Sequence, residues 1–465
     1  MIKKEKPSAQ IDMLHGSMMK KILLFAMPLA ASSILQQLFN AADAAVVGRF
    51  AGSESLAAVG ATSSAINLLI NIFVGLSVGA NVVIANYVGQ GKKEKIHDAV
   101  HTSLGIALVS GLFLLAAGML AAGPLLKLMN TPDNVLGLAV LYLRLYFIGM
   151  PFMMVYNFGS AVLRCVGDTK KPLYCLILSG FINVGLNLVF VILMGMGVAG
   201  VAIATVISNG ISAAMILWFL THSESEIRLS LKKICIRKPE LVKIMKIGLP
   251  AGLQSLVFSI SNVCIQSAVN SFGSSAVAGS AAALNYECIV YFVAAAFSQA
   301  AVTFTSQNFG AGKYERCKRV YGLCLISCAV ITAAMSTVFI IGRESLSSFF
   351  TTDATALQYS MERIVHVELL EFLLGVYEVT AGCMRGMMHS LLPAILTIIG
   401  TCVLRIVWIF TVFQWHRDFG VLLNSYPVSW ILTCIMVFIA YRMICRKEFV
   451  GDGTNGMAGI ETCDR

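Results

Sequence analysis

An acidic residue, Asp43, lies near the end of a long apolar run that begins at Ile22. An aspartate at the centre of a membrane helix costs about 2.5–3.5 kcal/mol on insertion scales, so its presence indicates a function. A carboxylate that alternates between an enclosed apolar setting and one that offers a cation can load and release a proton or Na⁺. The alternative is a carboxylate held by neighbouring hydroxyls and amides, which would serve helix packing only.

Polar residues in two later apolar segments are candidates to surround Asp43. Asn183 and Asn187 are four residues apart and share one helical face, and Thr205 follows in the next segment. Hard cations bind several oxygen ligands, which one carboxylate, two amides, a hydroxyl and backbone carbonyls can supply. A lone carboxylate is enough for H⁺. Each of the three neutral residues is also a common contact between membrane helices.

Four further carboxylates interrupt apolar segments in the second half, namely Glu287, Glu368, Glu371 and Glu378. The last three lie at offsets of 0, 3 and 10, close to one stripe of a continuous helix. Acids that face lipid are untenable, so we expect these to line a cavity or to pair with a cation such as Arg405. Glu287 or Glu371 is a candidate contact for a cationic substrate or a proton, and ion pairing alone is the simpler alternative.

The chain as a whole is too apolar for a soluble protein. Of its 465 residues 57% are hydrophobic and only 12% are charged, whereas soluble domains carry about 25% charged residues. The net charge of +10 does not indicate nucleic-acid binding, because the basic residues form short clusters between apolar segments. The thirteen cysteines include no CxxC pair, so reduced packing thiols are expected. The composition predicts a polytopic membrane protein.

The apolar pattern predicts an all-α protein with twelve transmembrane helices. The expected spans are 22–47, 55–87, 98–122, 136–159, 173–194, 198–220, 242–270, 277–306, 320–341, 358–381, 391–414 and 423–445. With both termini in the cytoplasm, 27 of the 34 Lys and Arg residues face the cytoplasm and four face outside. This bias matches the positive-inside rule, so the cell membrane and cytoplasmic termini are predicted. No cleavable signal peptide is expected, because the first apolar stretch is too long.

The two halves of the sequence form an internal repeat. "GQGKKEKIHDAV" at 89–100 matches "GAGKYERCKRV" at 310–320, and "VLRCVGDTKKP" at 162–172 matches "CMRGMMHSLLP" at 383–393, both at an offset of 221 residues. Six helices per half make the repeat parallel, a design in which two lobes rock around a central site. The expected organisation is an N-terminal tail (1–21), a first lobe (22–220), a linker (221–241), a second lobe (242–445) and a disordered tail (446–465).

Two other patterns carry little chemistry. The glycine-rich GxGK sequences do not match a phosphate-binding loop and are expected to be cytoplasmic turns after the second and eighth helices. His97 and His101 are four residues apart beside Glu94 and Asp98, a spacing that a metal site can use, but solvated charges are normal at such a helix start. No metal or cofactor is expected, apart from Na⁺ as a possible coupling ion at the Asp43 cluster.

These features together resemble the multidrug and toxic compound extrusion (MATE) family of the multidrug/oligosaccharidyl-lipid/polysaccharide flippase superfamily. The likeness is carried by "PLAASSILQQLFNAADAAVVGRFAG", "GQGKKE", "LRCVGDTKKP", "GFINVGLNLVF" and "GMGVAGVAIATVIS". The resemblance implies two six-helix lobes and a cation-coupling role for Asp43, Asn183 and Thr205. Family members often carry Asn-x-x-x-Asp where this chain has Asn183 and Asn187, which puts mechanisms with two acids in the first lobe in doubt.

The resemblance implies a monomeric transporter, not an enzyme, that exports drug-like, often cationic compounds in exchange for H⁺ or Na⁺. A lipid-linked oligosaccharide flippase of the same superfamily is the alternative, and it predicts a wide basic cavity and often more than twelve helices. A receptor or channel is a third reading, against which the duplicated halves and the lack of a recognisable sensor domain weigh. The expected partners are small molecules and the lipid bilayer, not nucleic acid.

Overall fold

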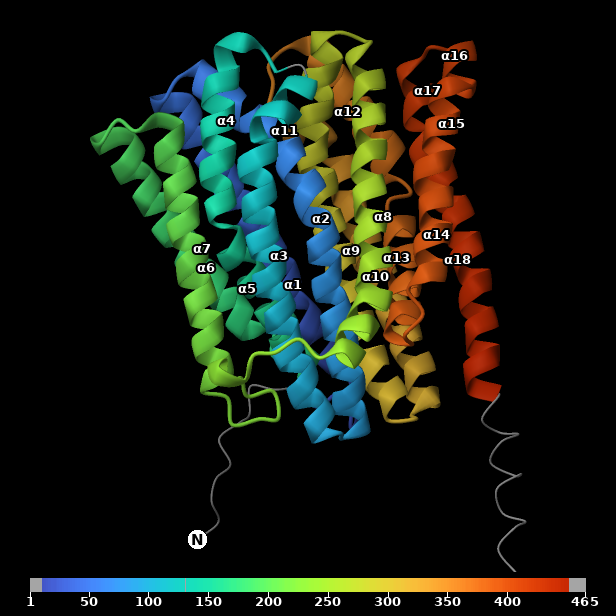
Figure 1. Cartoon of the computed structure of the whole chain (residues 1–465). Helices are drawn as coiled ribbons and strands as arrows, with labels where there is room; N and C mark the ends of the chain where they lie inside the picture. Colours follow the sequence, from blue (N-terminus) through green and yellow to red (C-terminus); the bar gives the residue numbers. More distant parts are fainter. Residues whose placement is uncertain (1–10, 130, 451–465) are drawn as a thin grey trace, which may run out of the picture. The chain divides into compact units, whose positions relative to one another are not determined.

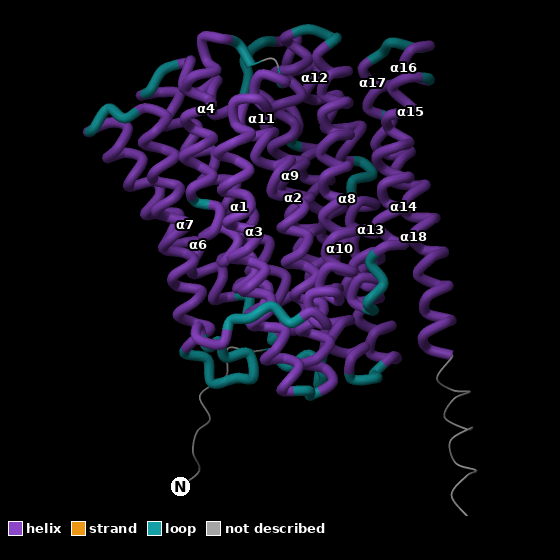
Figure 2. The backbone as a smooth tube through the Cα atoms, viewed as in Figure 1, coloured by secondary structure: helices purple, strands orange, loops and turns teal. Residues whose placement is uncertain are grey.

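The computed structural model describes residues 11–129 and 131–450, and this part of the chain consists of helices and loops without a strand (Figure 2). Residues 1–10 and 451–465 of the two expected tails lie outside the described residues. The chain divides into two compact units, one ending at Leu256 and the other beginning at Val257. This division falls inside one long helix, C-terminal to the expected linker.

The first unit is built mainly from long apolar helices, blue to green in Figure 1. It contains α1 (Met18–Phe50), α2 (Ser53–Gln90), α3 (Lys93–Leu128), α4 (Asp133–Ile148), α5 (Met150–Cys165), α6 (Lys170–Asn187), the π-helix η1 (Leu188–Leu193), α7 (Gly197–Thr221), the single-turn helix η2 (Leu231–Lys233) and the start of α8 (Lys238–Asn270).

The second unit repeats this order of elements with more interruptions. It contains the rest of α8, then α9 (Ser274–Gly310), α10 (Tyr314–Ile341), α11 (Arg343–Ser348), α12 (Ala354–Glu368), α13 (Phe372–Gly386), α14 (Leu391–Thr397), the π-helix η3 (Ile398–Val403), α15 (Leu404–Phe410), α16 (Val412–Trp415), α17 (Phe419–Leu423) and α18 (Ser425–Val450).

All twelve predicted spans have a helical counterpart in the described part of the chain. Ten stretches are long and apolar enough to cross a bilayer as one helix, and α4 with α5 makes an eleventh that bends by 47°. The remaining span is divided between α12 and α13, which are 15 residues each. The all-α fold class with two six-span halves is therefore confirmed, whereas the continuous tenth helix expected at 358–381 is wrong.

The repeat extends from sequence motifs to the helices themselves. The helices α1 and α8 both have 33 residues, and α8 begins 220 residues after α1 begins. The breaks in the fourth span of each half correspond too, since Gly149 separates α4 from α5 and Leu370 lies 221 residues later between α12 and α13. The predicted glycine turns are present, because Gly91 ends α2 with a φ of 66° and Gly312 follows α9 with a φ of 67°. Such left-handed conformations favour glycine.

Glycines bring α2 close to the first part of α8 within the first unit. A Cβ atom added to Gly75 would lie 2.3 Å from the Cα of Gly252, and one added to Gly79 would lie 2.4 Å from the carbonyl oxygen of Ile244. Small residues four apart allow such backbone contact between membrane helices. Beyond the glycines the Tyr87 hydroxyl donates to a Glu240 carboxylate oxygen at 2.6 Å.

We expect Gly75→Ala to destabilise the protein by about 1–3 kcal/mol, because the methyl group has no space and the backbones must separate. The matched control is Gly60→Ala on the same helix, where an added Cβ has no atom within 4 Å. That change should be neutral or stabilise by up to about 1 kcal/mol through helix propensity. Thermal unfolding in detergent measures both, and equal effects of the two substitutions would contradict the close contact.

Candidate functional site

The four residues expected to form the ion site meet in the first unit. Asp43 lies on α1, Asn187 and Asn183 lie on α6, and Thr205 lies on α7. The Asn187 amide nitrogen donates to Asp43 Oδ1 at 2.5 Å and to Asn183 Oδ1 at 3.3 Å. The Asn183 amide nitrogen in turn donates to the Thr205 hydroxyl at 3.5 Å, and that hydroxyl donates to the Val201 carbonyl at 2.9 Å. One hydrogen-bonded chain thus joins three helices to a single carboxylate.

The four side chains of this hydrogen-bonded network differ in how deeply they are buried. Asn187 is fully buried and Asn183 is 6% exposed, whereas Asp43 and Thr205 are half-buried. The Asn187 side-chain oxygen has no hydrogen-bond partner within the described residues. Buried polar atoms are normally paired, so an unpaired amide oxygen beside a carboxylate is an available ligand for a cation. The arrangement can hold a proton on Asp43, or a cation between Asp43 and the amide oxygens.

A cavity of about 100 Å³ opens beside Asp43 within the first unit. Amides, hydroxyls and aromatic rings line it, and Asp43 is the only charged side chain among the described residues of its wall. The lining residues are Gln36, Phe39, Asn40, Asp43, Tyr146, Met153, Tyr156, Asn157, Leu176, Ser179, Gly180, Asn183, Thr205, Ser208, Asn209 and Ser212. An acidic, aromatic pocket of this kind favours organic cations over anions.

Sequence reasoning missed most of these lining residues, although their spacing contained a signal. Gln36, Asn40 and Asp43 follow a four-then-three pattern that places them on one face of α1. On α7, Thr205 begins a similar series that continues through Ser208 and Asn209 to Ser212. A polar stripe along an otherwise apolar span identifies the face that turns away from lipid. Asn157 and Tyr146 also have polar neighbours at helical spacing, since Ser160 follows Asn157 by three residues and Tyr142 precedes Tyr146 by four.

In the second unit, Glu287 pairs with Arg363 and not with Arg405. The Arg363 guanidinium donates to both carboxylate oxygens of Glu287, at 2.6 and 2.9 Å, between α9 and α12. Both residues are buried. Arg405 instead donates to the Ser429 hydroxyl at 2.9 Å and lies 4.3 Å from the centre of the Tyr426 ring. The expectation that one of these acids pairs with a buried cation is therefore met by Arg363 and not by Arg405, whose guanidinium faces a hydroxyl and an aromatic ring of α18.

The three glutamates of the expected stripe are divided between two environments. Glu368 ends α12 and Glu371 lies three residues later in the turn before α13, and both side chains are buried. The Ser336 hydroxyl donates to Glu368, at 2.5 Å. Glu368 Oε1 and Glu371 Oε2 have no hydrogen-bond partner within the described residues, and two neighbouring buried acids favour a proton on one of them. Glu378 lies further along the chain on α13, where one of its carboxylate oxygens is 3.8 Å from the Arg385 guanidinium of the same helix.

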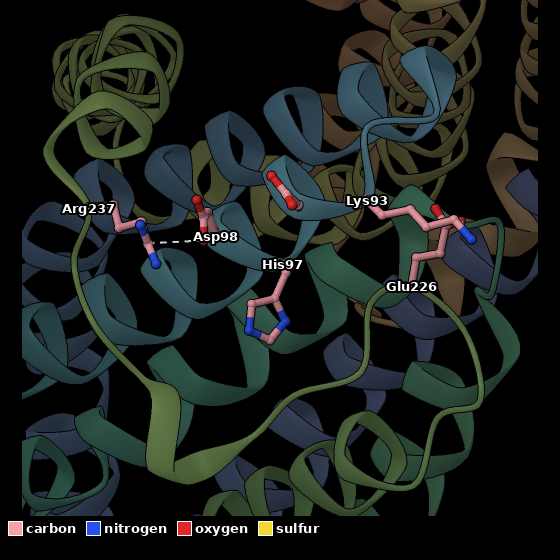
Figure 3. A pocket seen from close by; sticks show the side chains of 6 residues that line it. Lys93, His97, Asp98, Glu226 and Arg237 are labelled. Carbon is pink, nitrogen blue, oxygen red and sulfur yellow. Dashed lines mark ion pairs between the residues drawn. The ribbon is translucent and has the colours of Figure 1, made fainter.

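His97 and His101 lie near the start of α3, away from the Asp43 cavity. His101 accepts a hydrogen bond from the Ser230 backbone N–H at 3.1 Å, and its other ring nitrogen is 2.7 Å from the His97 carbonyl oxygen. His97 lines a surface cleft of about 530 Å³ that also contains the ion pairs Lys93–Glu226 and Arg237–Asp98 (Figure 3). Within the described residues no three His, Cys, Asp or Glu side chains are grouped as a metal site requires.

Comparison with known proteins gives a consistent result. The profile of the MatE family matches residues 28–189 and again residues 250–411, so the match itself is duplicated. The chain is 26% identical over 442 residues to the "Probable multidrug resistance protein YoeA" of Bacillus subtilis, covering 93% of this chain and 95% of that protein. It is 25% identical over 325 residues to a protein of Shewanella oneidensis named "FAD transporter", covering 69% and 72%.

A solved structure shares the fold. It is described as the outward-facing conformation of a multidrug resistance MATE family transporter of the MOP superfamily. It superposes with a TM-score of 0.89 at 23% identity, covering 96% of this chain and 99% of that one. With both halves matched by the family profile, this chain belongs to the MatE family and is a multi-pass membrane transporter, not an enzyme.

Proposed function

We propose that this protein exports cationic or amphipathic drug-like compounds across the cell membrane in exchange for H⁺ or Na⁺. The observation that supports this most directly is the Asp43 network, a lone carboxylate on the wall of a cavity and hydrogen-bonded to a buried amide. Adding a proton or Na⁺ to Asp43 cancels the only charge that the described part of the wall carries. A cationic substrate and the coupling ion therefore compete for the same negative charge, and this competition is the physical basis of exchange.

The cavity lining bears on the choice of substrate. Tyr146, Tyr156 and Phe39 offer aromatic faces, and the described lining contains no Lys, Arg or His. A cation over an aromatic face gains roughly 0.5–2 kcal/mol, depending on its desolvation. Lipid-linked pyrophosphates and dinucleotides are anions, and the carboxylate of Asp43 would repel them. Both the flippase alternative and an activity like that of the FAD transporter are therefore less well supported than export of cations.

Alternating access supplies the remaining part of the proposal. Parallel six-helix repeats characteristically rock against each other, and the loaded ion determines which rearrangement is favourable. On this proposal both termini face the cytoplasm, as the bias of basic residues predicts, and the protein works as a monomer. No resident cofactor is proposed.

An ion-substitution assay with purified protein in liposomes tests this function. A pH gradient and a Na⁺ gradient are imposed separately, and movement of a fluorescent cationic dye is followed. We expect one gradient to drive the dye and its collapse by an ionophore to stop the movement. Dye movement that is independent of both gradients would refute the exchange mechanism, and movement of an anionic dye alone would refute the substrate class.

For the second unit we propose that the Glu368–Glu371 pair holds a proton that contributes to coupling. Because Glu371 is only 3% exposed, we expect Glu371→Gln to slow export of cationic and neutral dyes alike, on the order of tenfold. Glu362→Gln on α12 is the control and should have little effect. Loss confined to cationic dyes would instead indicate that Glu371 contacts the substrate.

A further inference from the structure

The segment that follows α7 is held firmly along α3 within the first unit. Ile227 and Leu229 are buried, and the backbone N–H groups of Ser230 and Arg237 donate to the side chains of His101 and Thr102, at 3.1 and 3.2 Å. The segment crosses α3 as the green loop at the lower end of the first unit in Figure 1. It is therefore a docked element with a defined inner and outer face.

This segment lies at the level where the surface of α3 changes from charged to apolar. The first turns of α3, from Lys93 to Asp98, carry charged side chains, and the first large apolar side chains exposed on α3 are Leu108 and Val109. The docking contacts at His101 and Thr102 lie between these two zones. With a rise of 1.5 Å per residue they are about 12–14 Å from the start of α3 and about 9–11 Å from Leu108. A change from charged to apolar exposed side chains along a membrane helix is expected at the interface between water and lipid.

Exposed aromatic residues at the same end of the unit also indicate that the segment lies near the interface between water and lipid. Trp218 in the last turn of α7 is 57% exposed, four residues before the docked segment begins at His222. Tyr174 near the start of α6 is 55% exposed, and the Lys171 ammonium group lies 5.6 Å from the centre of the Phe219 ring, which brings these two helix ends together. Exposed Trp and Tyr residues are characteristic of the headgroup region of a bilayer.

The outer face of the segment combines basic and apolar side chains. Leu231 is 56% exposed and Ile236 is 42% exposed, and the three lysines between and beside them, Lys232, Lys233 and Lys238, are also exposed. None of these lysines forms an ion pair within the described residues, whereas Arg237 is already paired with Asp98 (Figure 3). Two apolar residues and three available ammonium groups at an interface match the chemistry of an anionic lipid surface.

We propose that residues 231–238 form a binding surface for the headgroups of anionic phospholipids. Lys232, Lys233 and Lys238 contact the headgroup phosphates, while Leu231 and Ile236 enter the outer part of the acyl layer. Because the inner face of the segment is fixed to α3, bound lipid is coupled to that helix. This inference concerns the position and charge of one segment and does not depend on the transported substrate.

Cys235 lies within this surface, is exposed, and provides a site for a probe. The full-length protein is labelled with a thiol-reactive fluorophore in liposomes of phosphatidylcholine with or without phosphatidylglycerol, and Cys235→Ser corrects for labelling elsewhere. Quenching by a headgroup spin-labelled lipid is compared with quenching by aqueous iodide. With phosphatidylglycerol present we expect lipid quenching to dominate by at least twofold.

The triple variant K232Q/K233Q/K238Q should reverse this preference, since each basic residue near an anionic surface contributes roughly fivefold to binding. The matched control K92Q/K313Q/R319Q removes the same charge at the turns after α2 and α9 and in the first turns of α10, and it should leave the quenching at Cys235 unchanged. Quenching that is identical with and without phosphatidylglycerol would overturn the proposal. The proposal would also be overturned if inorganic phosphate changed the quenching at Cys235 as much as phosphatidylglycerol does, because the surface would then bind free anions.

Discussion

Replacing Asp43 by Asn should abolish ion-driven export of a cationic dye, at least tenfold and down to the rate of protein-free liposomes. Among the residues that the structure describes, the substitution removes the only charge in the cavity wall and the only carboxylate of the α1–α6–α7 network. An amide neither loads a proton nor attracts a cation as a carboxylate does. Its oxygen still accepts the hydrogen bond from Asn187, so the fold should be retained.

The control for this experiment is Asp133→Asn, the same chemical change at an exposed position at the start of α4. That variant should transport at the rate of the unmodified protein. Expression level and thermal unfolding of both variants establish that any loss is functional. Undiminished export by Asp43→Asn, with either a pH or a Na⁺ gradient, would remove Asp43 from the coupling mechanism and leave the packing role as its explanation.

The second large effect is expected for Glu287→Gln, and it concerns stability. The Glu287 carboxylate accepts two hydrogen bonds from Arg363 between α9 and α12, and both side chains are buried. With Gln at this position the guanidinium stays buried without a counter-charge. Removing one partner of a buried ion pair costs about 3–5 kcal/mol, mostly because of the unpaired charge that remains. The unfolding temperature in detergent should fall clearly.

A double variant separates this explanation from a simple packing defect. Glu287→Leu combined with Arg363→Met removes both charges and keeps apolar side chains of similar length, so much of the lost stability should return. Scans at one fixed heating rate are compared, because unfolding of a membrane protein in detergent is commonly irreversible. A double variant that is less stable than Glu287→Gln would show that the pair itself stabilises the unit by more than its desolvation cost.

The span count and the repeat were predictable from the sequence for a clear physical reason. In a bilayer each backbone polar group must be satisfied within its own segment, so long apolar stretches form helices almost independently of their neighbours. The clustering of Asp43, Asn183 and Thr205 was expected from the family resemblance, and the four-residue spacing of Asn183 and Asn187 added only that these two share one face of α6. The repeated motifs at 89–100 and 310–320, and at 162–172 and 383–393, revealed the two halves because they lie at corresponding places in each half.

Pairing in the second unit was not predictable in this way. Arg363 and Arg405 are both buried within spans, and spacing along one helix cannot tell which of them meets Glu287. The break between α12 and α13 follows no proline in the sequence, so local signals did not predict that Glu368 ends one helix, that Glu371 lies in the turn before the next, or that Glu378 lies near Arg385 on α13. Local sequence therefore determined which segments cross the membrane and which of their faces are polar. Only the tertiary structure decided which polar groups meet, because such contacts depend on how side chains from different helices fill the space between them.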